Sequence, residues 1–89
     1  MPQAIGDPDE IDRFAQSLTQ FIDTLNEAVN GLNHSFSALG DTWQDEKRAH
    51  FEEDYNALVQ QLSHFETNAS EQVPYLHAQA SRLRDYLQS

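Results

Sequence analysis

The residues best suited to chemistry are one histidine and three carboxylates in the second half of the chain. The group comprises Glu46, His50, Glu53 and Asp54. Spacings of three and four residues place them on one surface of a helix, where they could bind a hard or borderline divalent cation. At ~100° per residue, however, this surface points away from the apolar stripe of the same helix, toward water. We therefore expect a solvated charged surface, with no metal and no cofactor.

The remaining candidates for catalysis are isolated. His34, His64 and His77 have no recognisable nucleophile beside them, and the sequence contains no cysteine. The serines form no Gly-x-Ser-x-Gly motif, and there is no glycine-rich loop that could bind a phosphate. These features predict a protein that is not an enzyme and that works through binding.

Composition narrows the class of partner. The 89 residues include 15 acidic and 5 basic side chains, which gives a formal net charge of −10. Such a chain repels a phosphate backbone, so we expect no nucleic-acid partner. Its apolar runs are too short for membrane insertion, and residues 1–12 do not resemble a signal peptide. We expect a single domain, residues 1–89, that is made in the cytoplasm and is exported, if at all, without a cleaved signal peptide.

The first element that the sequence predicts is a long helix over residues 8–39. Asp7 is a suitable N-cap, Pro8 suits the first helical position, and Glu10 can complete a capping box. Apolar residues then recur at alternating steps of three and four, as on one face of a helix. Gly40 follows the last of them, and we expect it to end the helix in the left-handed conformation.

A second helix is predicted over residues 42–73, with Asp41 or Thr42 as its cap. No stretch alternates with a period of two, so strands are not expected. A connection of two or three residues forces the helices to lie antiparallel, with Pro8 level with about residue 73. The predicted fold is therefore an all-α, antiparallel two-helix hairpin.

The C-terminal segment, residues 74–88, then extends past the end of the first helix. Pro74 removes a backbone donor and either kinks the helix or opens a new segment. The apolar stripe continues through Leu76, Leu83 and Leu87 with no partner left on the first helix. The segment can fold back as a third helix or project toward another chain; we favour projection because the apolar spacing continues across the join.

Two pairs of adjacent apolar residues widen the stripes at mid-helix. They are Phe21-Ile22 and Leu58-Val59, and they lie about equally far from Gly40, so we expect them to be level with each other. A shared broad patch at that height suits a second hairpin packing alongside, as in a four-helix bundle. We therefore predict a homodimer or a heterodimer with another helical protein.

The sequence contains two basic clusters, which we expect to form local ion pairs. Lys47-Arg48 and Arg82-Leu83-Arg84 lie within one turn of several carboxylates, including Glu52 and Asp85. Such neighbours commonly form weak surface ion pairs. We expect local pairing in both clusters, although an acidic partner is an alternative ligand.

Trp43, the single tryptophan, lies three residues after Gly40. Its ring can close the end of the hairpin, or it can anchor a partner. The stretch from Leu39 to Phe51 resembles the centre of the Trp-x-Gly family of small type VII secretion proteins, which includes the early secreted antigen type. Trp43 and Phe51 match the family's tryptophan and the apolar residue about eight positions later, whereas Asp45 stands where the family has glycine.

This resemblance implies a helical hairpin that pairs as an antiparallel four-helix homodimer or heterodimer. It also implies a secretion substrate or a companion of a larger effector. Many members carry a Tyr-x-x-x-Asp/Glu export signal; here Tyr55 is followed at that spacing by Val59 and Tyr75 by Gln79, while Tyr86 lies too near the end. The alternative function is an intracellular structural or regulatory bundle, such as an antitoxin-like, plasmid or phage accessory protein.

Overall fold

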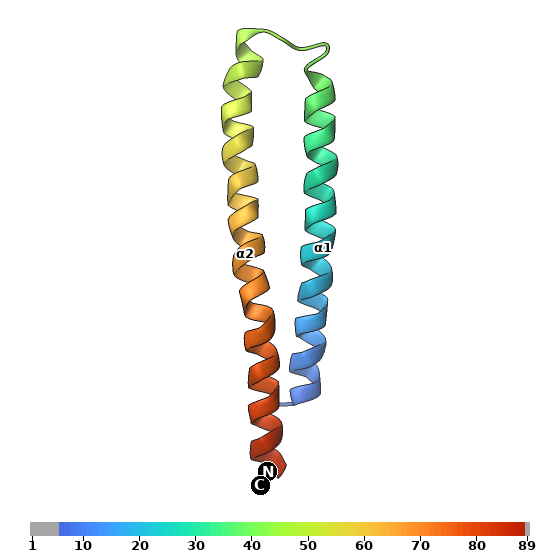
Figure 1. Ribbon diagram of the computed structural model, residues 1–89, viewed down its shortest axis with the longest axis vertical. Coiled ribbons are helices and arrows are strands. Elements are labelled where there is room, and N and C mark those ends of the chain that lie inside the picture. The colour runs from blue at the N-terminus through green and yellow to red at the C-terminus, as the bar shows by residue number, and fades with distance from the viewer. Residues whose placement is uncertain (1–5, 89) are drawn as a thin grey trace.

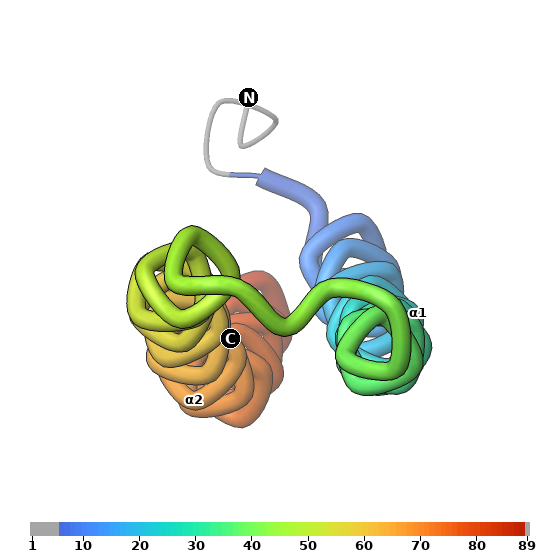
Figure 2. The backbone as a smooth tube through the Cα atoms, turned by 90° about the horizontal axis from the view of Figure 1, so that it is seen from above, coloured from blue at the N-terminus to red at the C-terminus, as the bar shows by residue number. Residues whose placement is uncertain are grey.

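Two long helices joined by one turn make up the described part of the molecule. The structure is a computed structural model that describes residues 6–88. α1 spans Pro8–Leu39 and α2 spans Glu46–Gln88, and they run antiparallel (Figure 1). Viewed end on, the two helices lie side by side (Figure 2), and the molecule measures 66 × 18 × 17 Å. The predicted all-α hairpin is confirmed, and residues 6–88 contain no strand.

The start of α1 follows from its first residues. Asp7 is in an extended conformation, and its Oδ1 accepts a hydrogen bond of 2.9 Å from the Asp9 amide. Pro8 occupies the first helical turn, where its missing N–H leaves no helical bond unmade. Glu10 does not form the expected capping box; its carboxylate instead forms an ion pair with Arg13. The predicted boundary at Pro8 is correct because the cap and the proline both act locally.

The end of α1 differs from the prediction. Gly40 has φ −60° and ψ −20°, which is right-handed and not the expected left-handed conformation. The chain instead tightens at the helix end, where the Thr42 and Trp43 amides donate to the Leu39 carbonyl at 3.1 and 2.9 Å. A Cβ at position 40 would lie 3.2 Å from the Ser37 carbonyl oxygen and 3.0 Å from Nη2 of Arg48, so a larger residue would be crowded there.

The cap of α2 also lies later than predicted. Neither Asp41 nor Thr42 caps the helix; the side chain of Asp45 accepts a 3.1 Å hydrogen bond from the Arg48 amide. The connection therefore comprises the six residues 40–45 rather than two or three. Asp45 is well suited to the position because a short carboxylate can accept from the free amides of the first turn.

The longer turn changes the register of the hairpin. Pro8 was expected to be level with residue 73, so Asp12, four residues later, should lie level with a residue four positions before 73. Asp12 instead contacts His77, with 2.7 Å between Oδ1 and Nδ1. Nearer the turn, the rings of Phe21 and Phe65 meet edge to face. The register expected from a short turn is thus wrong, and more of α2 lies along α1 than that register allowed.

As a consequence, α1 packs against part of the segment after Pro74. α2 continues unbroken through Pro74 and stays beside the N-terminal part of α1 (Figure 1). Ala80 is buried, and Leu83 lies against Gly6, where an added Cβ would be 3.5 Å from its Cδ2. Leu87 remains exposed. The segment extends α2 as predicted, but the expectation that it projects away from α1 is wrong.

The core between the helices is thin. The buried hydrophobic residues are Ala15, Tyr55, Ala69 and Ala80. None of the large side chains in the described region is fully buried. The ribbons of the two helices lie closer together toward the open end than near the turn (Figure 1).

Candidate functional site

Large apolar side chains remain exposed along one side of the hairpin, which we call the open face. Its members are Phe14, Phe21, Leu32 and Leu39 of α1 and Phe51, Leu58 and Phe65 of α2, each 41–60% exposed. Most of the steps between them are seven residues, which in a helix returns to nearly the same direction. Each helix thus carries one exposed stripe beside the residues that pack between the helices.

Contacts between the two stripes place them on the same side. Phe21 and Phe65 meet with ring centroids 6.1 Å apart and an interplanar angle of 87°. Closer to the turn, a groove of about 490 Å³ runs between the helices. Its walls are Leu32, Ser35, Phe36, Leu39, Phe51, Tyr55 and Leu58. Within this strongly acidic chain, the groove is therefore almost wholly apolar and carries no charged side chain.

Phe36, Trp43, Phe51 and Tyr55 form an aromatic cluster, of which Phe36, Phe51 and Tyr55 line the groove. Phe36 stacks on Tyr55 with centroids 4.5 Å apart, and Phe51 lies 5.9 Å from Phe36 and 6.3 Å from Tyr55. The Arg48 guanidinium lies 4.9 Å from the centre of the Phe36 ring, where the face of the ring attracts a cation. The cluster thus joins both helices at the turn.

Trp43 connects this cluster to the turn. Its half-buried ring lies 6.1 Å from that of Phe51, with an interplanar angle of 38°. Two residues later, Asp45 caps α2. The stretch from Trp43 to Asp45 therefore both seals the end of the hairpin and starts the second helix. The structure places Trp43 and Phe51 together, and Phe51 in turn contacts Phe36 and Tyr55.

The pairs Phe21-Ile22 and Leu58-Val59 are not level with each other. Phe21 meets Phe65, whereas Leu58 shares the groove with Leu32, so the expectation of one patch made by both pairs is wrong. The six-residue turn is the reason, since it shifts α2 along α1. Only the first member of each pair lies on the open face; Ile22 and Val59 are half-buried.

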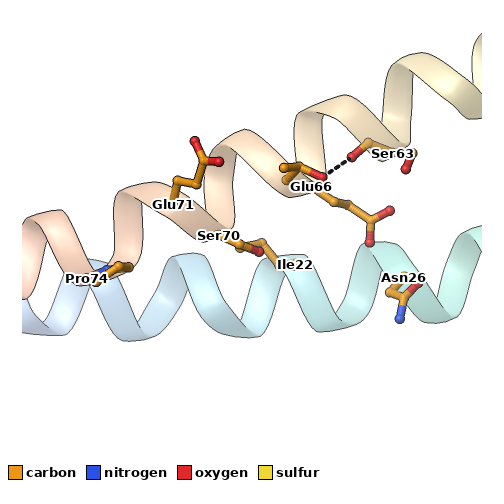
Figure 3. Close-up of a pocket in the computed structure, with 8 residues that line it drawn as sticks. Ile22, Asn26, Ser63, Glu66, Ser70, Glu71 and Pro74 are labelled. Carbon is orange, nitrogen blue, oxygen red and sulfur yellow. Dashed lines mark hydrogen bonds between the residues drawn. The ribbon is translucent and has the colours of Figure 1, made fainter.

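Ile22 instead contributes to a groove of about 570 Å³ on the other side of the hairpin. Figure 3 shows Ile22 beside Ser70 of α2, with Glu66 directed toward α1 and Glu71 directed away from it. Most of the residues that line this second groove have hydroxyl, amide or carboxylate side chains. The two sides of the hairpin are therefore chemically different.

Four residues join the helices at the open end of the hairpin, and we call them the clasp. They are Asp9 and Asp12 of α1 and His77 and Arg84 of α2. Arg84 Nη2 donates to Asp12 Oδ2 at 2.6 Å and to Asp9 Oδ1 at 2.8 Å. His77 and Arg84 hold the pKa of the Asp12 carboxyl below its ordinary value through hydrogen bonds and charge. Asp9 and then Asp12 raise the pKa of Arg84 in the same way.

Sequence reasoning missed the clasp. Arg48 pairs with Glu52 one turn away as expected, with 3.5 Å between Nη1 and Oε1, but Arg84 pairs across the hairpin rather than only within its own helix. An ion pair between residues 72 positions apart depends on the register of the helices. A correct turn length was the one signal that could have revealed it.

The acidic group around His50 lies on the surface of α2. Glu46, His50 and Glu53 are exposed and share a shallow depression with Lys47 and Ala49. Within residues 6–88, no group of three or more histidine, aspartate or glutamate side chains is arranged to hold a metal ion. Lys47 also adds a positive charge beside these carboxylates, which disfavours a cation.

A two-helix hairpin with an open apolar face and an aromatic turn defines a small all-α protein of the helical-hairpin class. Residues 5–86 match the model of the WXG100 family, which is described as proteins of 100 residues with WXG. The chain belongs to the WXG100 family and is a small helical protein related to type VII secretion. No curated protein and no solved structure matched the chain.

Neither helix is apolar over a long enough stretch to cross a membrane, as judged over the described residues. Proteins of the WXG100 family are small, helical and non-enzymatic, and they are secreted through type VII systems without a signal peptide. The resemblance identified around Trp43 is thereby confirmed across nearly the whole chain, with Asp45 in place of the motif's glycine.

Proposed function

We propose that this protein acts in type VII secretion by pairing its open face with a second helical hairpin. The pair would be an antiparallel four-helix bundle, either a homodimer or a heterodimer with another helical protein. The observation that carries the proposal is the open face itself, in which seven large apolar side chains remain 41–60% exposed. Contiguous apolar surface of this kind marks an interaction site in soluble proteins.

The geometry of the groove supports a helix as the occupant. Leu32, Leu39, Phe51 and Leu58 line two parallel ridges with Phe36 and Tyr55 between them. A helix that inserts apolar side chains at steps of three and four fits such a channel, as in bundle packing. The lack of charge along the groove also lets a second acidic chain approach without direct repulsion at the contact.

Family membership favours this secretion-related role over the alternative of an intracellular regulatory bundle. We propose that the protein is a substrate of the secretion system or a companion of a larger effector. Tyr55 and Tyr75 are followed at the fourth position by Val59 and Gln79, so neither of these tyrosines forms the Tyr-x-x-x-Asp/Glu export signal. The protein would need no cofactor for this role.

Sedimentation equilibrium tests the pairing directly. The chain is measured alone and mixed with a helical hairpin protein encoded beside it, first as the natural sequence and then as Leu58→Glu. A carboxylate at position 58 lies in the groove, so we expect the dissociation constant to rise about tenfold or more. Ala57→Glu is the matched control, because Ala57 is exposed and is not part of the groove.

Circular dichroism of each variant checks that helicity is retained. If the natural chain sediments as a monomer both alone and in every mixture, the proposed pairing is overturned. Equal weakening by Leu58→Glu and Ala57→Glu would also count against the open face, because it would show an effect of charge that does not depend on position.

A further inference from the structure

Pro74 leaves a gap in the hydrogen bonds of α2. A proline has no backbone N–H, so the Ser70 carbonyl has no donor four residues later. Ser70 and Pro74 line the same groove, opposite Ile22 of α1 (Figure 3). The carbonyl therefore lies beside a groove that solvent can enter. α2 bends most easily at this point, because one helical hydrogen bond is already missing there.

Packing beyond Pro74 is light. Ala80 is buried but small, and Leu83 contacts Gly6, which has no side chain. Leu76 is half-buried, and Leu87 is 41% exposed. The ring pairs between α1 and α2 that join described residues lie nearer the turn, at Phe21 with Phe65 and at Phe36 with Phe51 and Tyr55. Apolar contact alone therefore holds this end of the hairpin weakly.

The clasp adds ionic contacts between α1 and α2 at this end of the hairpin. Arg84 bridges two carboxylates of the first turns of α1 at 2.6 and 2.8 Å, and His77 reaches one of them at 2.7 Å. The other ion pairs between described residues, Glu10 with Arg13 and Arg48 with Glu52, each lie within one helix. Over residues 6–88, the clasp is thus the only ionic link between α1 and α2.

We propose that residues 75–88 form an arm that opens about Pro74 and that the clasp holds shut. In the closed state the arm keeps its own Ala80 buried and seats Leu83 on Gly6. In the open state it presents Leu76, Ala80 and Leu83 to solvent or to another chain. The arm therefore has a closed and an open state, with a weak point at Pro74 and the clasp near its other end. A binding partner or high salt can shift the populations of these two states.

Hydrogen exchange of the full chain, measured by mass spectrometry at neutral pH and low salt, tests whether the clasp holds the arm shut. We expect the amides of residues 76–88 to exchange about threefold faster in Arg84→Ala, since the variant loses a small network of exposed ion pairs. The amides of residues 46–70 should keep their rates. Alanine is the better helix former, so fraying of the helix end cannot explain faster exchange in this variant.

Arg82→Ala is the matched control. Arg82 is exposed, lies two residues from Arg84, and forms no ion pair with any described residue. Equal rates in the two variants would overturn this role of the clasp, and so would an increase spread evenly over both helices, because that pattern indicates a general loss of stability. Raising the salt concentration should speed the exchange of residues 76–88 in the natural chain but hardly in Arg84→Ala.

Pro74→Ala tests the hinge in the Arg84→Ala background. The restored N–H can bond the Ser70 carbonyl, so exchange of residues 76–88 should slow again toward that of the natural chain. An unchanged rate would overturn the hinge. These measurements are repeated in Leu58→Glu at a concentration where that variant is monomeric, so their result does not depend on pairing through the open face.

Discussion

The ring of Phe36 stacks on that of Tyr55 with centroids 4.5 Å apart, and this contact ties the two helices together next to the turn. The Tyr55 hydroxyl also donates a hydrogen bond to Oδ1 of Asn33. Tyr55 is the one large side chain among the buried hydrophobic residues, at 7% exposure. The contact between these helices therefore depends on it more than on any other described side chain.

Tyr55→Ala should accordingly lower the free energy of unfolding by about 3 kcal/mol, because it removes a buried ring from a thin core. Tyr55→Phe keeps the ring and loses the hydrogen bond to Asn33, so its loss should be about 1 kcal/mol. Urea unfolding followed by circular dichroism measures both values. Equal losses in the two variants would mean that the hydroxyl, not the ring, accounts for the stabilisation.

Trp43→Ala should lower the free energy of unfolding by about 1–2 kcal/mol, less than a fully buried ring would. The reason is that the ring is half-buried and packs on Phe51 alone among the described aromatic side chains. Its fluorescence reports the same packing, and Phe51→Ala should shift the emission of Trp43 to longer wavelength. A loss above that range would show that the ring is more deeply packed than described.

Asp45→Ala should lower the free energy of unfolding by about 1 kcal/mol, because it removes the N-cap of α2. Asp45→Gly restores the glycine of the family motif and should lose only a few tenths of a kcal/mol, since glycine is itself an acceptable cap. Thermal melting of the two variants separates these values. A larger loss for glycine than for alanine would argue against capping as the role of Asp45.

Gly31→Ala should raise the free energy of unfolding by about 0.5–1 kcal/mol, because glycine is a poor residue for a helix interior. A Cβ at position 31 meets no atom within 4 Å, so the methyl group creates no clash. Gly40→Ala is the comparison: there a Cβ would lie 3.2 Å from the Ser37 carbonyl and 3.0 Å from Arg48. Urea unfolding should show a gain only at position 31.

Acid should weaken the clasp through Asp12. Its pKa lies below the ordinary 3.8, first because of the hydrogen bond from His77 and then that from Arg84. A carboxyl with a lowered folded pKa stabilises the fold above its unfolded value and loses that contribution as pH falls through the folded one. Between about pH 6 and about pH 2, melting temperatures of the natural chain and Asp12→Asn should therefore converge below pH 3.8.

Asp23→Asn is the control for this experiment, because Asp23 is exposed on the same helix and forms no ion pair with a described residue. Its difference from the natural chain should change little over the same range. A difference between the natural chain and Asp12→Asn that persists at the acid end would contradict a charge-dependent role for Asp12.

Local signals made α1 predictable. Asp7 and Pro8 act within one turn of the helix start, and the apolar spacing needs no knowledge of a partner. The cap of α2 was harder, because Asp41, Thr42 and Asp45 all have suitable side chains within five positions. Propensity does not choose among such neighbours. The choice of Asp45 accompanies the packing of Trp43 on Phe51, a contact that exists only once the chain has turned.

The sequence by itself determined that this protein is two amphipathic helices with more apolar surface than one hairpin covers, because helical periodicity and capping are properties of neighbouring residues. Tertiary structure alone decided the register, and with it which residues meet. Arg84 reaches Asp9 and Asp12, and Phe21 meets Phe65 rather than Leu58, because a six-residue turn shifts α2 along α1. A shift along the helix axis leaves each helix's own pattern unchanged, so that pattern carries no record of it.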